Sequence, residues 1–261
     1  MPFDESRYHL LRRSVTVGVE VVHVEETGST MDDARAGAQA GRRPGTAYVA
    51  AAQTAGRGRL GRSWVSEPGA GLWVTYHLRA GRGAPFLSIA GGLAVLDALK
   101  VTADLTCTMK WPNDVLYGHR KIAGILAEVR PAPDGAEIFL GIGINLRTPA
   151  TMPSDVMAIA TSVEQEGRPP PARETLLAAL SDALERRAGQ AEDDAAAMVD
   201  EWRQRLSTLG EVVRVTLPDG SVVEGEALDV EPDGSLILDV AGTRRVFSAG
   251  DVTSTRPGGP A

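Results

Sequence analysis

The chain has 261 residues, of which 43% are hydrophobic and 23% are charged, and its formal net charge is −7. This composition is typical of a globular protein rather than a disordered or fibrous one, and the acidic balance excludes a broad basic surface for non-specific nucleic-acid binding. Cys107 is the single cysteine, which excludes an intramolecular disulfide bond and a cysteine-based zinc site and fits a reducing compartment.

The N-terminus and the apolar runs of the chain indicate a cytoplasmic protein without a membrane partner. Residues 1–7 lack the basic start and apolar core of a signal peptide. No apolar run approaches the roughly 20 residues that span a bilayer. The length suits one large domain plus one small one.

The first half of the chain predicts strands interleaved with helices. Residues 20–24 are a short β-branched run, and the helix start that follows has Thr30 and Asp33 spaced as a capping box. Short turns such as 131–135 between adjacent strands indicate an α+β fold with a mixed or antiparallel sheet and flanking helices. Further strands are expected over 46–52, 72–78, 106–111, 122–129 and 138–146, and a core helix over 86–99.

The second half predicts two helices and then a separate β-rich unit. The helices are expected over 175–187 and 195–206, after a stiff run of three prolines. Short strands at 212–217, 222–230, 235–240 and 243–247 are separated by Pro-Asp-Gly and Ala-Gly turns, which predicts a small β-barrel of about 50 residues. We therefore expect a large domain at 1–206, a barrel at 207–255 and a tail at 256–261.

A loop rich in glycine and arginine follows the strand at 46–52. Residues 56–61 match the GxGxxG pattern of dinucleotide-binding proteins, but a strand rather than a helix follows, and no acidic residue lies at the ribose-binding distance. Arg57, Arg59 and Arg62 lie among glycines, so the backbone can approach a ligand closely while the guanidinium groups supply permanent charge. This chemistry suits phosphates and carboxylates, and a solvated basic turn is the alternative.

Three further segments have patterns that suit a ligand site. The sequence Lys-Trp-Pro-Asn-Asp-Val at 110–115 ends a predicted strand and either presents Asn113 and Asp114 from a loop or forms an ordinary turn. At 120–128 Lys121 stands at the start of an apolar strand, where it either contacts a ligand or keeps the end of the strand soluble. At 141–146 glycines alternate with apolar residues, which is typical of a strand that a ligand approaches or of a sheet bend.

Together these segments resemble the motifs of the biotin protein ligase family. The order is Ser-Thr at 29–30, Gln-Thr-Ala-Gly-Arg-Gly-Arg-Leu-Gly-Arg-Ser-Trp at 53–64, Lys-Trp-Pro-Asn-Asp-Val at 110–115, Lys-Ile-Ala-Gly-Ile-Leu at 121–126 and Gly-Ile-Gly-Ile-Asn at 141–145. The long arginine–glycine motif is the specific one, and the resemblance covers roughly residues 20–255. It implies a class II synthetase-like catalytic domain at 1–206 and an SH3-like C-terminal β-barrel. The implied reaction uses ATP to convert biotin to biotinyl-5′-AMP and transfers the biotin to a lysine of a biotin carboxyl carrier protein.

The resemblance also implies residue roles. Lys121, Arg59 and Asp114 are the expected catalytic residues: Lys121 bridges the biotin carboxylate and the α-phosphate, Arg59 retains the adenylate, and Asp114 assists a metal or the attacking lysine. Mg²⁺ is expected on the phosphates, with no residue assigned to hold it. The expected binding residues for biotin and ATP are Ser29, Thr30, Gln53, Gly56, Arg57, Gly58, Arg59, Arg62, Trp64, Asn113, Lys121, Gly124 and Asn145.

The sequence departs from the family's pattern in two places. Met31 stands where many members have Asn. About 20 residues precede the first strand, too few for the helix-turn-helix domain that some members carry, so the short form without DNA binding is expected. A homodimer stays open. Because the reaction needs no covalent enzyme intermediate, Cys107 is expected to take no part in it.

Two other functions are alternatives to the reaction that this resemblance implies. A lipoate or octanoate ligase shares the fold, but the arginine–glycine loop followed by Ser63 and Trp64 favours biotin. A non-catalytic protein that uses biotinyl-adenylate as a signal is the second alternative, and Lys121 together with the missing DNA-binding segment counts against it.

Overall fold

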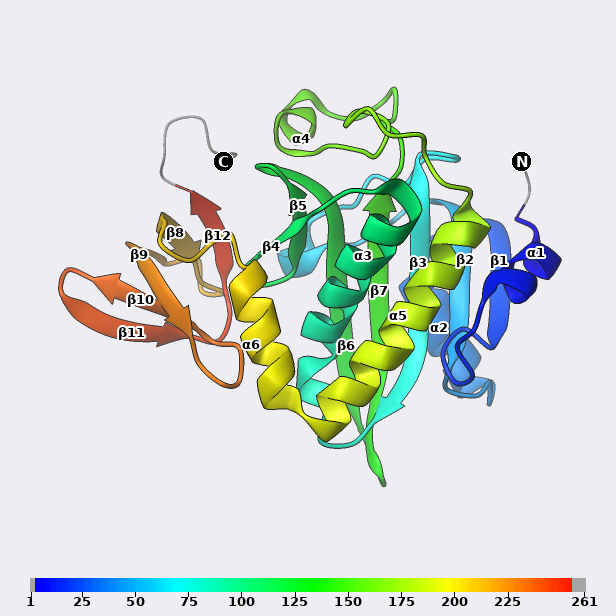
Figure 1. Cartoon of the computed structure of the whole chain (residues 1–261), viewed down its shortest axis with the longest axis horizontal. Helices are drawn as coiled ribbons and strands as arrows, with labels where there is room; N and C mark the ends of the chain where they lie inside the picture. The colour runs from blue at the N-terminus through cyan, green and yellow to red at the C-terminus, as the bar shows by residue number, and fades with distance from the viewer. Residues whose placement is uncertain (1–2, 255–261) are drawn as a thin grey trace.

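The computed structural model describes residues 3–254, which form a large α+β part and a small β part (Figure 1). The tail predicted at 256–261 lies outside the described residues. Six helices and twelve strands make up the described part of the chain.

A seven-stranded mixed sheet organises the large part. Its order is β1-β2-β3-β7-β6-β5-β4, and every neighbouring pair is antiparallel except β1 and β2, so the predicted mixed sheet is confirmed. The strands are β1 (Glu20–Thr27), β2 (Thr46–Gln53), β3 (Gly71–Ala80), β4 (Thr108–Lys110), β5 (Asp114–Tyr117), β6 (Arg120–Ala132) and β7 (Gly135–Asn145).

Helices cover both faces of this sheet. On one face α3 and α5 pack together with α6, and on the other α2 packs against β2, β3 and β7 (Figure 1). The helix α2 covers only part of its face, and the part of this face beyond α2 is available for a site. The helices are α1 (Glu5–Leu11), α2 (Thr30–Gln39), α3 (Leu87–Ala103), α4 (Ser154–Ile159), α5 (Arg173–Asp193) and α6 (Ala195–Arg205).

The helix α3 is the central element of the hydrophobic core. It extends the short 3-10 turn η2 (Ala84–Phe86), and most of its residues are buried. The segment Ala84–Ala103 has the length and mean hydropathy, 1.6, of a membrane span, but 67% of its most apolar stretch is buried inside the protein. A core helix accounts for this composition, because a helix that is apolar on all sides is the kind that is packed on all sides.

A five-stranded antiparallel sheet forms the small part, in the order β11-β10-β9-β8-β12. The predicted C-terminal β unit is present, but within residues 3–254 its edge strands β11 and β12 do not pair, so the sheet is not a closed barrel. Trp111 ties it to the large part by donating from Nε1 to the carbonyl of Gly234 at 3.0 Å. The strands are β8 (Val212–Thr216), β9 (Val222–Val230), β10 (Leu236–Val240), β11 (Thr243–Phe247) and β12 (Asp251–Ser254).

Two local predictions were wrong, for physical reasons. The cap of α2 is Ser29, whose side chain accepts from the backbone N–H of Met31 at 3.3 Å, while Asp33 accepts instead from Thr27 Oγ1 at 3.0 Å. Asp114 is the first residue of β5 rather than part of a loop, because β4 and β5 form a tight hairpin. The elements α1, β5, α4 and β12 were not predicted.

Candidate active site

Three glycines form the floor of the main pocket. Gly143 on β7 pairs with Gly124 on β6, which pairs with Asp114 on β5, so these residues lie in one row across the sheet. Side chains alternate between the faces of a strand, and Gly141 therefore faces the same side, while Ile142 and Ile144 are buried in the core on the other. The alternating glycines noted in the sequence thus leave space on the ligand side only.

The ring of Trp64 lies directly on this floor. A Cβ atom at Gly143 would come within 2.7 Å of Trp64 Nε1, and one at Gly124 within 3.0 Å of Trp64 Cζ3. Trp73 on β3 packs edge-on against the same ring, with centroids 6.3 Å apart. The Trp64 Nε1 atom is buried without a hydrogen-bond partner among the described residues. The pocket is therefore flat, aromatic and glycine-floored at its centre.

A network of buried polar groups forms one end of the pocket. Gln53 Oε1 accepts from the backbone N–H of Thr30 at 2.9 Å and from its hydroxyl at 3.1 Å, and Gln53 Nε2 donates to Ser66 Oγ at 2.8 Å. Thr30 Oγ1 also lies 2.8 Å from Thr75 Oγ1, a fully buried hydroxyl on β3. This end can recognise a ligand by hydrogen bonds, because buried polar groups favour partners that pair with them.

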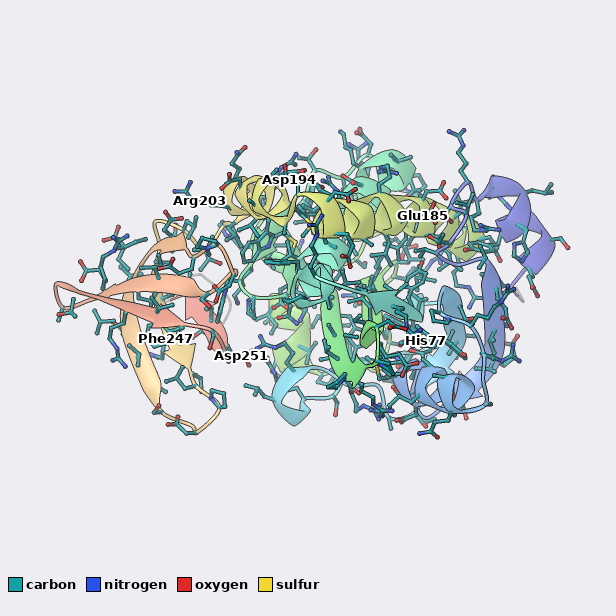
Figure 2. All side chains as sticks on the ribbon, turned by 90° about the horizontal axis from the view of Figure 1, so that it is seen from below. His77, Glu185, Asp194, Arg203, Phe247 and Asp251 are labelled. Atoms are coloured by element: carbon teal, nitrogen blue, oxygen red, sulfur yellow. The ribbon has the colours of Figure 1, made fainter. Side chains whose placement is uncertain are left out.

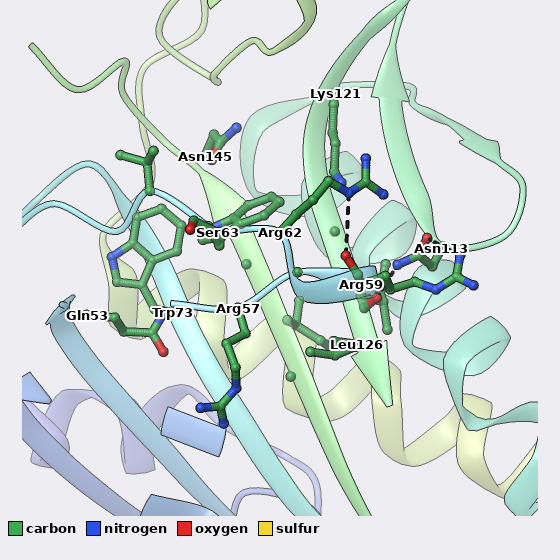
Figure 3. Close-up of a pocket in the computed structure, with 18 of the residues that line it drawn as sticks. Gln53, Arg57, Arg59, Arg62, Ser63, Trp73, Asn113, Lys121, Leu126 and Asn145 are labelled. Atoms are coloured by element: carbon green, nitrogen blue, oxygen red, sulfur yellow. Dashed lines mark hydrogen bonds between the residues drawn. The ribbon is translucent and has the colours of Figure 1, made fainter. Parts of the chain in front are cut away.

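The arginine–glycine loop folds back on itself over the pocket. Gly58 N–H donates to the carbonyl of Arg62 at 2.7 Å, and Trp64 N–H donates to the carbonyl of Gly56 at 2.9 Å. Leu60 at its tip has φ of +54°, a left-handed conformation that is uncommon for a bulky residue, and its side chain is exposed. The loop is therefore a hairpin-like cover whose arginines surround the pocket (Figure 3).

Each loop arginine has an anionic partner from elsewhere in the fold. Arg57 donates to both carboxylate oxygens of Asp32, at 2.7 and 2.9 Å, and this contact lowers the pKa of Asp32 to about 2. Arg59 and Arg62 both pair with Asp251 on β12, where Arg59 Nη1 lies 3.7 Å from Oδ1. Figure 2 shows Asp251 at the boundary between the small sheet and the large part. The C-terminal sheet thus holds the loop from outside.

Lys121 and Asp114 form an ion pair at the other end of the pocket. The Nζ atom of Lys121 lies 2.5 Å from Asp114 Oδ1 and 5.1 Å from the centre of the Trp64 ring (Figure 3). An extra residue in β6, at Ile122, shifts the register against β5, so Lys121 faces the pocket although it lies three residues from Gly124. The ammonium group is therefore placed at the edge of the glycine floor.

The two asparagines expected at the site are fixed by the backbone around it. Asn113 Nδ2 donates to the carbonyl of Ile125, and its Oδ1 accepts from Arg59 Nη1 at 3.4 Å. Asn145, at the end of β7, is 6% exposed and donates to the carbonyl of Thr161 at 3.0 Å. Both side chains are therefore held in place before any ligand binds.

All but one of the residues predicted for the site line this pocket. Gly56 does not line the pocket. A Cβ atom at this position would lie 2.5 Å from the carbonyl oxygen of Trp64, so the missing side chain allows the two arms of the loop to pack closely. No sequence motif marks Thr75, Ser66, Trp73 or the residues around α4 as part of the site. Strand residues such as Thr75 show no motif, and the pocket residues Met152, Val156, Ile159 and Ala160 stand in an unremarkable stretch of sequence.

The described residues contain no group of three or more His, Cys, Asp or Glu side chains that could hold a metal ion. A metal cage made only by the protein is therefore not part of the site as described in residues 3–254. Cys107 is 3% exposed, and burial raises the pKa of its thiol to about 12.

Comparison with known proteins assigns the family. Residues 29–145 match the model of the biotin/lipoate A/B protein ligase family, and residues 208–253 match the biotin protein ligase C-terminal domain. Over 241 residues the chain is 38% identical to the biotin–[acetyl-CoA-carboxylase] ligase of Mycobacterium tuberculosis, covering 89% of this chain and 88% of that protein. The chain belongs to the biotin protein ligase family. The resemblance seen in the motifs and the enzyme class that it implied are thereby confirmed.

Solved structures of biotin protein ligases have the same fold. The Aquifex aeolicus enzyme in complex with biotin and ATP matches with a TM-score of 0.76 at 24% identity, over 92% of this chain and all of that one. The Leishmania major enzyme in complex with biotinyl-5-AMP matches with a TM-score of 0.60 at 26% identity, over 88% of this chain and 99% of that one. The predicted fold class, a mixed-sheet domain followed by a small β unit, is confirmed for this biotin protein ligase.

Proposed function

We propose that this biotin protein ligase activates biotin with ATP to biotinyl-5′-AMP and transfers the biotin to a lysine of a biotin carboxyl carrier protein. The observation that carries the proposal is the ion pair of Lys121 and Asp114 at one end of a glycine-floored pocket that the loop arginines surround. Such a site can place two anions, a carboxylate and a nucleotide, against each other.

Biotin lies in this proposal on the glycine floor beside Trp64. Its polar ureido ring is placed at the end where Ser29, Thr30 and Gln53 gather, because those buried groups select a ligand that satisfies them. The rest of the ligand lies along the apolar surface of Trp64. Its carboxylate then extends toward Lys121 at the opposite end of the pocket.

Activation needs the repulsion between two anions to be offset. A carboxylate oxygen of biotin attacks the α-phosphorus of ATP, and pyrophosphate leaves with the electron pair of the broken P–O bond. Lys121 lines the pocket and is proposed to contact both the carboxylate and the α-phosphate, while Arg59 and Arg62 are proposed to add positive charge from the loop. Asn113 and Asn145 are proposed to bind the nucleotide, as are the residues of α4 that line the pocket.

Mg²⁺ is part of the proposal as the counter-ion of the nucleotide phosphates. The carboxylates present fit this role, because the described residues offer single groups such as Asp114 near the pocket and no cluster of three or more. In nucleotide sites most ligands of Mg²⁺ are water molecules and phosphate oxygens, so one or two carboxylates are enough. When bound, it lowers the charge repulsion on the phosphates.

Transfer requires a neutral amine at the adenylate. The carrier lysine attacks the mixed anhydride, the amide bond forms, and AMP leaves, so the protein needs no covalent intermediate. Asp114 is proposed to orient or deprotonate that amine, and the loop, held by Asp251, to keep the adenylate in the pocket until the carrier arrives. The proposed acceptor is the carrier domain of a biotin-dependent carboxylase in the cytoplasm.

The test is exchange of labelled pyrophosphate into ATP, with biotin, lipoate or octanoate supplied in turn. We expect exchange with biotin, and loss of at least about 100-fold in Lys121→Met, because a charge acting on the transition state is removed. Lys100→Met, at an exposed lysine on α3, is the matched control and keeps full activity. Exchange that depends on lipoate or octanoate instead would refute the choice of substrate.

A further inference from the structure

Lys110 ends the strand β4 at the rim of the row that forms the pocket floor. In the β4–β5 hairpin Lys110 pairs directly with Asp114, with no bulge between them. Residues paired in this way have their side chains on the same face of the sheet. The row therefore continues from Gly143 through Gly124 and Asp114 to Lys110 at the edge.

Lys110 lies beside the pocket without lining it, and it differs from the cations that do line it because its ammonium group forms no ion pair. Arg57 pairs with Asp32, both Arg59 and Arg62 pair with Asp251, and Lys121 pairs with Asp114. The side chain of Lys110 forms no hydrogen bond or ion pair with another residue in the described range 3–254. Its ammonium group is thus free to contact a ligand without first leaving an ion pair.

The side chain of Lys110 is also partly withdrawn from water. Burial lowers the pKa of Lys110; the carboxylates of Asp114 and Asp251 oppose that shift, and the cations Lys121 and Arg62 add to it. A desolvated ammonium group that no carboxylate contacts directly is unfavourable. A site with this feature is completed when an anion binds.

The order of groups along the row indicates which anion this is. In the proposed function, on which this inference rests, the α-phosphate of ATP lies at Lys121 beside Asp114. Beyond Asp114 the row ends at the edge strand β4, whose last residue is Lys110, so a triphosphate that extends along the row from Lys121 toward the sheet edge would reach Lys110. We propose that Lys110 binds the β- and γ-phosphates of ATP and holds the pyrophosphate leaving group.

This role confines Lys110 to one half-reaction. When biotin's carboxylate forms its bond to the α-phosphorus, the bond from that phosphorus to the β-phosphate oxygen breaks, and the oxygen takes the electron pair. The Lys110 ammonium group offsets the charge that grows there. The transfer of biotin from biotinyl-5′-AMP to the carrier lysine releases AMP and involves no pyrophosphate, so Lys110 has no part in it.

The experiment compares the two half-reactions in full-length Lys110→Met, which keeps the length of the stem without the charge, and in Lys110→Arg, which keeps the charge. The first is measured as biotin-dependent pyrophosphate exchange at varied ATP, pyrophosphate and biotin. The second is measured as single-turnover transfer from synthetic biotinyl-5′-AMP to a purified biotin carboxyl carrier domain of acetyl-CoA carboxylase. Lys100→Met is the matched control.

In Lys110→Met we expect KM for ATP and for pyrophosphate to rise about 10- to 100-fold, the loss typical of one charge-assisted contact. KM for biotin and the rate of transfer from biotinyl-5′-AMP stay within about twofold of wild type, and Lys110→Arg recovers most of the exchange. Equal loss in both half-reactions would overturn the inference, since it indicates a structural role, and so would unchanged exchange. Absence of biotin-dependent exchange in wild type would instead refute the proposed function itself.

Discussion

Replacing Gly143 with alanine puts a methyl group under the ring of Trp64. The new Cβ would lie 2.7 Å from both Cε2 and Nε1 of that ring, about 0.7 Å short of the 3.4 Å at which ordinary contact begins. The backbone of β7 is fixed by its pairs on both sides, with Trp73 and Gly124, and cannot yield. The ring must therefore move up into the space that we assign to biotin.

The expected cost follows from this overlap. Inserting a methyl group into a packed site costs about 1–3 kcal/mol. Trp64 belongs to a partly exposed loop, so most of that cost falls on the bound state rather than on folding. We therefore expect the affinity for biotin to fall roughly 5- to 150-fold, with a change in Tm of less than about 4 °C, the shift that 1 kcal/mol produces in a chain of this size.

Isothermal titration with biotin and differential scanning calorimetry measure the two quantities. Gly189→Ala is the control, because Gly189 lies in α5 with nothing within 4 Å of its added Cβ. There we expect unchanged biotin affinity and a gain of about 1 kcal/mol in stability, since alanine is the better helix former. Biotin affinity unchanged in Gly143→Ala would refute the placement of the ligand on this floor.

Three other predictions concern the surroundings of the pocket. Asp251→Asn removes the carboxylate shared by Arg59 and Arg62, and we expect release of biotinyl-5′-AMP to accelerate several-fold. Stability should change by less than about 1 kcal/mol, because Arg62 is largely exposed. Equal release rates of biotinyl-5′-AMP by stopped-flow would contradict this. The Asp32 carboxyl should titrate by carbon NMR near pH 2 and return toward 3.8 in Arg57→Met; stability from the Arg57 contact is thus present above about pH 3.8 and lost as pH falls through about 2. Cys107, with its pKa raised to about 12, should react with iodoacetamide only after unfolding, and Cys107→Ala should keep full exchange activity.

Local patterns in the sequence were enough to predict most of the sheet. Within the predicted strand at 138–146, residues 141–144 alternate glycine with isoleucine, and in the structure the glycines and the isoleucines lie on opposite faces, as the period of a strand requires. The turn signals after residue 210 likewise marked all but the last strand of the small sheet. These features are local, so neighbouring residues alone carry them.

Contacts between distant segments could not be predicted in this way. Asp32 meets Arg57 across 25 residues and Asp251 meets Arg62 across 189, and the second contact joins the small sheet to the loop that follows β2 of the large one. Thr75 reads as an ordinary β-branched strand residue, yet its hydroxyl is buried against Thr30 at the pocket end. Its role becomes visible only when the start of α2 is packed against β3.

The position of Lys121 shows how much depends on one residue of register. In a regular strand, Lys121 and Gly124 would face opposite sides, because they are three residues apart. The bulge at Ile122 adds one residue to β6 between the pairs Leu116–Lys121 and Val115–Ala123, and this brings Lys121 onto the face of the glycines while Ile122 is fully buried. The motif Lys-Ile-Ala-Gly therefore specifies a bulge as well as an ammonium group, since the same residues in a regular strand would put the lysine in the hydrophobic core.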